Sequence, residues 1–263
     1  MLSVYKTFTL RYNKVVFIYK SPVKWGVQIV GMIFQIRSNT ITGKDTNHMS
    51  QSSFGNKFKV TTWGESHGKA LGAVIDGCPA GLPLCEEDIQ KFLDRRKPGQ
   101  SRYTTARKEG DLVEILSGVF EGKTTGTPIS LMVRNTDQRS RDYGNIAYSY
   151  RPGHADYTFD QKYGFRDYRG GGRSSGRETI GRVAAGAIAS KILGELGISI
   201  CTYTKSIGPV EIASFNKEEI HQNAFYMPDA QAAVKAGEYL EECMKNQDSA
   251  GGVIECRITG TPA

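Results

Sequence analysis

The sequence predicts a protein of mixed helices and strands, with no internal repeat. Two observations lead to this prediction. Apolar residues favour strands at 58–63 and 71–75, on either side of a turn-like Gly-Glu-Ser-His-Gly segment. A long run of small apolar residues at 180–196 favours a buried helix.

Other patterns complete the expected order of elements. A helix is expected at 86–96, where apolar residues share one face and a Pro-Gly pair follows. The polar stretch 135–152 is typical of a functional loop. Further patterns predict strands at 112–120, 129–133, 198–204, 210–214 and 253–259, and helices at 156–163 and 229–245.

The net charge of +7 is concentrated at the N-terminus. Residues 1–48 hold seven of the 34 Lys and Arg but one of the 27 Asp and Glu, so the rest is nearly neutral. A neutral body disfavours a broad nucleic-acid-binding surface. We therefore expect an N-terminal extension at 1–48 and a domain at 49–263. A misplaced start codon and a basic amphipathic membrane arm are the two interpretations of the extension.

Five cysteines occur, and their spacing matches no zinc site. An odd number in a chain of this size favours reduced thiols, and hence a soluble cytoplasmic protein without a disulfide framework. No metal site is expected.

A glycine-rich segment at 170–179 combines three glycines with Arg173, Ser174, Ser175 and a second arginine, directly before the small-residue helix. Glycines allow a ligand close to the backbone, and a helix start offers free N–H groups. Arginine binds phosphate or carboxylate through two N–H groups. We interpret the segment as an anion-binding loop; a flexible turn with solvated arginines is the alternative.

Two histidines lie in glycine-bordered, charged loops. His67 follows Ser66 in the turn between the first two expected strands, and His154 lies in Arg-Pro-Gly-His-Ala-Asp. Histidine suits proton transfer near neutral pH. A catalytic role and an ordinary surface position both remain open for these residues.

A second cationic group surrounds the Pro-Gly pair and includes Arg96 and Arg102. Cations at a helix C-terminus are favourable in themselves, so helix capping is one explanation. Arg102 lies beyond the turn and favours a phosphate or carboxylate site instead. The glycine segment lacks GxGxxG spacing, which disfavours a nicotinamide dehydrogenase.

Together these blocks resemble the chorismate synthase family, and the match runs from about Gly55 to the last residue. The blocks are GESHG at 64–68 with LGAVIDGCPAG at 71–81, RRKPGQSR at 95–102, NTDQ at 135–138, RPGHADY at 151–157 and RGGGRSSGR at 169–177.

The resemblance implies an α+β fold, with a helical core sandwiched between antiparallel sheets, assembled as a homotetramer. It implies a lyase of the shikimate pathway that makes chorismate by 1,4-anti elimination of phosphate from 5-enolpyruvylshikimate 3-phosphate. It also implies dependence on reduced FMN, with NADPH as a candidate reductant and a separate flavin reductase as a candidate partner. No nucleic-acid or membrane partner is expected.

The resemblance also assigns roles to residues. His67 would help to protonate the departing phosphate, with Ser66 as a supporting donor, and His154 would give a proton to reduced flavin. Arg96 and Arg102 would bind the anionic groups of the substrate, or NADP. Contacts with FMN would come from Arg173, Ser174 and Ser175.

Three departures from the family pattern stand out. The extension at 1–48 has no counterpart in it. Cys85 replaces a helix-capping Thr or Ser, which should weaken the cap by about 1 kcal/mol. Family members also continue past residue 263, so a truncated site is expected. The alternative function is an inactive remnant that binds flavin or phosphate without turnover.

Overall fold

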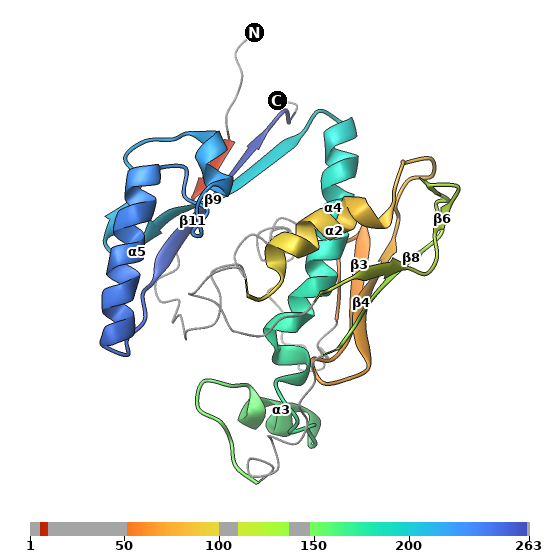
Figure 1. The fold of residues 1–263 in the computed structure, drawn as a ribbon. Coiled ribbons are helices and arrows are strands. Elements are labelled where there is room, and N and C mark those ends of the chain that lie inside the picture. Colours follow the sequence, from red (N-terminus) through yellow and green to blue (C-terminus); the bar gives the residue numbers. More distant parts are fainter. Residues whose placement is uncertain (1–5, 10–51, 100–109, 137–147, 262–263) are drawn as a thin grey trace, which may run out of the picture. The chain divides into compact units, whose positions relative to one another are not determined.

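A computed structural model describes residues 6–9, 52–99, 110–136 and 148–261 (Figure 1). The chain divides into two compact units. The first contains Met1–Gly26, Pro98–Ala106 and Ser190–Ala263, and the second contains Val27–Lys97 and Arg107–Ala189. Described helices and antiparallel strands occur in both units, which confirms the α+β class.

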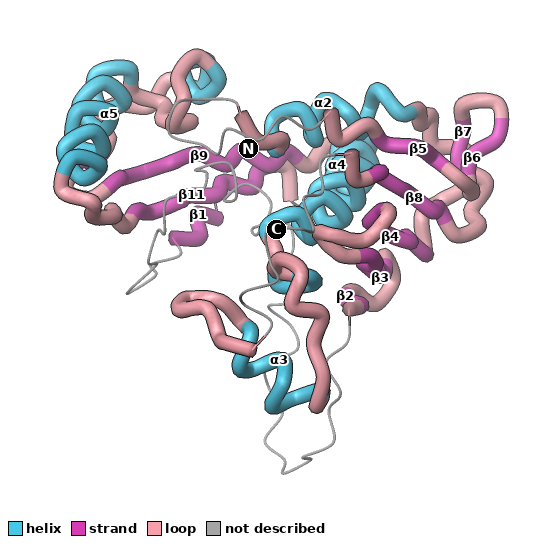
Figure 2. The backbone as a smooth tube through the Cα atoms, turned by 60° about the horizontal axis from the view of Figure 1, so that its bottom comes forward, coloured by secondary structure: helices cyan, strands magenta, loops and turns pink. Residues whose placement is uncertain are grey.

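The second unit contains a five-stranded antiparallel sheet in the order β2-β3-β4-β8-β5 (Figure 2). The strands expected at 58–63, 71–75 and 129–133 are confirmed. The sheet is built from β2 (Ser53–Phe54), β3 (Lys59–Gly64), β4 (Ala70–Asp76), β5 (Val113–Ile115) and β8 (Ile129–Arg134).

The prediction of one strand over 112–120 is wrong. The chain turns at Gly118, where φ is +80°, and a side chain there would collide with Ile129. The segment therefore splits into β5 and a second short strand, β6 (Val119–Phe120), which pairs with β7 (Lys123–Thr124).

Helix α2 (Glu86–Arg96) has the predicted bounds and buries Ile89 and Leu93. Cys85 occupies the N-cap position, and its backbone N–H donates to the Asp88 carboxylate at 3.3 Å. Acidic residues fill the first turn and arginines the last, as the helix dipole favours. The cap therefore depends on Asp88.

Helix α4 (Thr179–Glu195) confirms the buried helix and lies along the sheet of the second unit (Figures 1 and 2). The approach is close at Gly181, where an added Cβ would lie 2.7 Å from the carbonyl oxygen of Gly72. Small residues at this crossing let the helix and strand β4 touch through their backbones. The shorter helix α3 (Asp156–Tyr163) also has the predicted bounds.

The first unit contains a four-stranded antiparallel sheet in the order β1-β11-β9-β10. Strands β9 (Ser199–Ile207) and β11 (Gly252–Thr259) confirm the predictions at 198–204 and 253–259. Strand β1 (Lys6–Thr9) was not predicted; it lies in the extension and pairs with β11 from Lys6↔Ile258 to Thr9↔Glu255.

The strand predicted at 210–214 is shorter in the structure, where β10 covers Val210–Glu211. The backbone N–H groups of Ala213 and Ser214 donate instead to the Asp229 carboxylate, each at 3.0 Å. The other Asp229 oxygen caps α5 (Ala230–Lys245), and these backbone donors lower the pKa of Asp229 to about 2.

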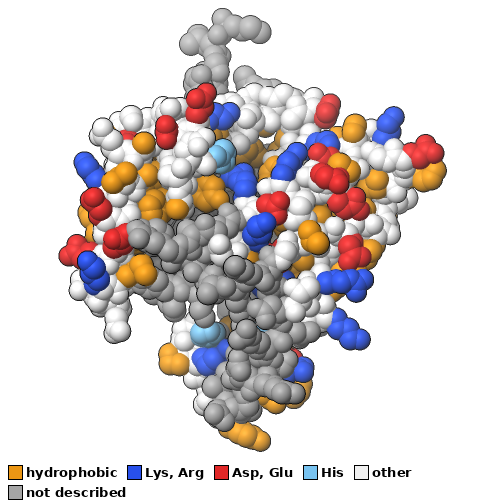
Figure 3. All heavy atoms as spheres, in the orientation of Figure 1, with side chains coloured by type: hydrophobic (Ala, Val, Ile, Leu, Met, Phe, Trp, Pro, Cys, Tyr) orange, Lys and Arg blue, Asp and Glu red, His pale blue; other side chains and the backbone are white. Residues whose placement is uncertain are grey.

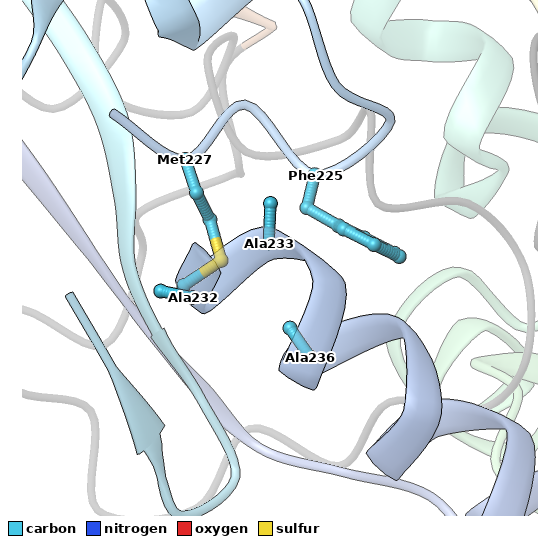
Figure 4. Close-up of a cluster of buried hydrophobic side chains, with 5 residues drawn as sticks. All are labelled: Phe225, Met227, Ala232, Ala233 and Ala236. Atoms are coloured by element: carbon cyan, nitrogen blue, oxygen red, sulfur yellow. The ribbon is translucent and has the colours of Figure 1, made fainter. Parts of the chain in front are cut away.

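Helix α5 covers a small apolar core in the first unit (Figure 4). Met227 is fully buried, and the alanines of α5 let the helix approach it closely. The cluster comprises Phe225, Met227, Ala232, Ala233 and Ala236.

All five cysteines carry free thiols. Within the described ranges, no helix has both the length and the apolar character that crossing a membrane requires. Acidic and basic side chains are interspersed on the face drawn in Figure 3.

Candidate functional site

A buried carboxylate, Asp111, joins two arginines from distant parts of the second unit. Its side chain is 0% exposed. One oxygen accepts a hydrogen bond from Arg96 at the end of α2 (2.8 Å), and the other accepts from Arg177 before α4 (3.1 Å). Sequence reasoning missed Asp111, because a single acidic residue before a strand carries no local signal.

Arg177 extends this network to the turn that carries Ser66 and His67. Its Nε donates to the side-chain oxygen of Asn135 at 3.0 Å. The Asn135 amide then donates to the carbonyl oxygens of Glu65 (2.9 Å) and Gly68 (2.7 Å). Three blocks that the sequence singled out are thereby joined in one hydrogen-bonded cluster.

Within the turn, the buried Ser66 hydroxyl lies 3.0 Å from Nδ1 of His67. The backbone of Gly170 lies against the imidazole, since an added Cβ would overlap Cε1 and Nδ1 of His67. Gly170 also has φ +77°, which favours glycine. The glycine-rich segment thus places its first glycine against the His67 ring.

Arg151 holds Gly170 in this place. Its guanidinium forms two hydrogen bonds with the Asp156 carboxylate (2.8 and 2.7 Å) and donates to the carbonyl oxygen of Gly170 (2.9 Å). Hydrogen bonds from Arg151, strengthened by the charge of Arg166, lower the pKa of Asp156 to about 2 despite its burial.

His154 is exposed in the loop before α3. Its Nδ1 lies 3.0 Å from the carbonyl oxygen of Pro152. A carbonyl can only accept, so Nδ1 carries a proton and Nε2 is the nitrogen left to exchange one. The neighbouring Arg151 ties the loop of His154 to Gly170.

Arg173 is turned toward strand β3. Its guanidinium donates to the Gly64 carbonyl oxygen (3.0 Å) and to the Thr62 hydroxyl (2.6 Å), and lies 3.4 Å from the Glu178 carboxylate. These contacts fasten the glycine-rich segment to the sheet. These bonds use the two terminal nitrogens of the guanidinium, which has five N–H donors, so Arg173 keeps donor capacity for a ligand.

The two serines of the segment differ in exposure. Ser174 is exposed and its hydroxyl donates to the Gly171 carbonyl oxygen at 2.7 Å, whereas Ser175 is half-buried and accepts from the backbone N–H of Arg177 at 3.3 Å. Both hydroxyls keep further hydrogen-bonding capacity for a ligand.

The structure therefore links Arg96, the turn of Ser66 and His67, and the segment of Arg173, Ser174 and Ser175. Arg102 lies outside the described residues. No group of three or more His, Cys, Asp or Glu side chains in the described ranges is arranged to hold a metal ion.

The fold and site define an α+β protein with clustered arginines and two loop histidines, which suits binding and proton transfer on an anionic ligand. Comparison with known proteins is more specific. Residues 58–263 match the family model described as chorismate synthase, and the chain belongs to that family.

Curated relatives are highly similar. A chorismate synthase of Agathobacter rectalis is 70% identical over 216 residues, 81% of this chain and 59% of the relative. One from Lachnoclostridium phytofermentans is 68% identical over 217 residues, 82% of this chain and 59% of the relative. The chain thus spans about three-fifths of the length of these relatives.

A solved structure described as the crystal structure of chorismate synthase matches with a TM-score of 0.63 at 34% identity. The match covers 79% of this chain and 59% of the other. Within the extension, residues 11–47 match a family of unknown function (DUF6783).

Proposed function

We propose that the protein acts as a chorismate synthase, a lyase that eliminates phosphate from 5-enolpyruvylshikimate 3-phosphate to form chorismate. The observation that carries the proposal is the cluster joining Arg96, Asp111, Arg177 and Asn135 to the turn of His67. Family membership supports the same reaction.

The charges of the cluster suit an anionic substrate. Two guanidinium groups, those of Arg96 and Arg177, lie on the two oxygens of the single Asp111 carboxylate, so cationic groups are concentrated here. The substrate carries a phosphate and two carboxylates, and fixed cations stabilise such groups without reorganisation. In this proposal Arg96 and Arg102 bind the anionic groups of the substrate, and the alternative ligand of this pair is NADP.

The turn suits proton donation to the departing phosphate. If the Ser66 hydroxyl donates to Nδ1 of His67, the ring proton stays on Nε2, which in this proposal is the donor to the leaving oxygen. The Gly170 backbone and the Ser66 hydroxyl both lie close to Nδ1 of the ring and restrict it. Nε2 of His154 would be the second nitrogen that exchanges a proton, because Nδ1 lies against the Pro152 carbonyl oxygen.

The glycine-rich segment fits an anionic cofactor in part. Ser174 is exposed, and among the described residues only Glu65, at 4.0 Å, lies within 4 Å of a Cβ added at Gly172, which favours approach of a ligand to the backbone there. Ser174 and Ser175 would hold reduced FMN, with Arg173 as a third contact. The reduced flavin would supply electron density that eases breaking of the C–O bond.

The proposal extends to a cytoplasmic homotetramer, served by NADPH or a separate flavin reductase. The test is anaerobic incubation of a form of the protein that spans the full length of its relatives with 5-enolpyruvylshikimate 3-phosphate and chemically reduced FMN, with chorismate and phosphate measured together. We expect both products in equal amounts and neither without flavin. Flavin or phosphate binding without product would support the alternative, a binding protein without turnover.

A further inference from the structure

Asp111 has an unusual backbone for a buried residue. Its φ is +46°. Among the described non-glycine residues with positive φ, Asp111 is the one that is buried. Such a conformation costs free energy for an L-residue and persists where the surroundings hold it. Asp and Asn tolerate it better than other side chains.

Contacts on several sides hold this conformation. The Asp111 carbonyl oxygen accepts from the side-chain amide of Gln90 at 3.2 Å, and the same side chain accepts from the backbone N–H of Val113 at 3.0 Å. The carboxylate then bonds Arg96 and Arg177. The backbone is therefore fixed by α2, and the side chain bridges α2 to the segment before α4.

We propose that Asp111 is a positioning residue, whose carboxylate fixes Arg96 for substrate binding and, through Arg177 and Asn135, fixes the turn of His67. The inference rests on the proposed function. It predicts that one buried carboxylate controls both substrate affinity and turnover, although Asp111 itself touches neither of the two histidines in any contact that the structure gives.

Asp111→Asn tests this role with little change of shape. Asparagine keeps one acceptor oxygen but places an NH₂ group against the second guanidinium, and it tolerates the positive φ. Because charged hydrogen bonds are lost, we expect KM for 5-enolpyruvylshikimate 3-phosphate to rise about 10- to 100-fold and kcat to fall about 10-fold.

A second readout does not require turnover. The Gly68 backbone N–H donates to the Glu65 carbonyl oxygen at 3.2 Å, so its hydrogen exchange reports whether the turn is closed. Asn135 bonds both carbonyls that frame this turn. In Asp111→Asn we expect Gly68 to exchange about 10-fold faster in the ligand-free protein, because its support through Asn135 loosens.

Two further variants separate positioning from stability. Asp111→Gly removes the carboxylate and also the cost of positive φ, which offsets part of the stability lost with the two ion pairs, and it should share the functional defects of Asp111→Asn. Asp229→Asn weakens another buried, hydrogen-bonded carboxylate, at the start of α5. It should lower the thermal midpoint without changing KM, kcat or Gly68 exchange.

The outcomes are distinct. Unchanged KM and kcat in both Asp111 variants would overturn the inference, even if Gly68 exchanged faster, and would leave the proposed function intact. A wild-type protein without turnover would overturn the proposed function. In that case, faster Gly68 exchange in the Asp111 variants would still support the role of Asp111 in positioning the turn. Unchanged Gly68 exchange would overturn this role too.

Discussion

Gly170 lies with its backbone against the imidazole of His67, although about a hundred residues separate them along the chain. A Cβ at Gly170 would overlap two ring atoms of His67. The hydrogen bond from Arg151 to the Gly170 carbonyl oxygen holds this contact. The glycine-rich segment thus restricts the His67 ring, in addition to its proposed role in ligand binding.

Gly170→Ala should therefore displace His67. The methyl group meets the ring and also requires an L-residue at positive φ, so we expect a loss of about 2–3 kcal/mol in the free energy of unfolding, measured with urea. Turnover should fall at least about 10-fold, because the proton donor moves.

Gly194→Ala is the matched control for this prediction. Gly194 lies in α4 with open space at its Cβ position, so the free energy of unfolding should rise by about 0.5–1 kcal/mol. Equal stability of Gly170→Ala and wild type would contradict the packing of Gly170 on His67.

Because of Asp156, the free energy of unfolding should depend on pH in the acidic range. Its pKa is lowered from 3.8 to about 2 in the folded protein, so its carboxylate favours folding above pH 4. That contribution, about 2 kcal/mol, is lost as pH falls through 4 toward 2. In Asp156→Asn the free energy of unfolding should be lower at pH 7 and depend less steeply on pH in this window.

Urea denaturation at several pH values between 2 and 7 measures this difference. The same slope in wild type and Asp156→Asn would mean that the ion pair with Arg151 contributes nothing in solution. Asp167→Asn serves as a comparison, because Asp167 is paired with the exposed Arg169 and its pKa is also lowered. Solvent screening should make its effect smaller.

His67→Ala and His154→Ala should each lower kcat by about 10²- to 10⁴-fold, the usual effect of losing a general acid. KM should change less, since proton donation acts mainly in the transition state. His221→Ala is the control, because His221 lies exposed in the first unit and has no role in the proposed reaction. Full turnover in His154→Ala would reduce His154 to an ordinary loop residue.

Removal of residues 1–48 should leave the contacts of Asp111 intact and expose an edge of β11. The extension contributes β1 to β11 in the first unit, whereas Asp111, Arg96 and Arg177 lie in the second unit. We expect a protein starting at Met49 to fold and bind substrate as before, with faster amide exchange along β11 and a greater tendency to aggregate. Unchanged exchange along β11 would show that β1 does not pair in solution.

Local patterns in the sequence determined most of the elements. Helices α2 and α3 have the predicted bounds. A one-sided apolar face, an acidic first turn and a following Pro-Gly pair favour α2, whereas α3 begins with an acidic residue and ends at Gly164. The ordered blocks also indicated the family, which the comparisons confirm. The same blocks contain the candidate site residues Ser66, His67, Arg96 and Arg173.

Only the tertiary structure decided which of these residues touch. Asp111 and Arg177 are 66 residues apart, and nothing local to either predicts the ion pair. Arg173, for which a contact with FMN stays a prediction, donates to the Gly64 carbonyl oxygen of strand β3, more than a hundred residues earlier. A carboxylate or guanidinium takes the partners that chain folding brings within hydrogen-bond reach, whereas periodicity reports only which face of an element is buried.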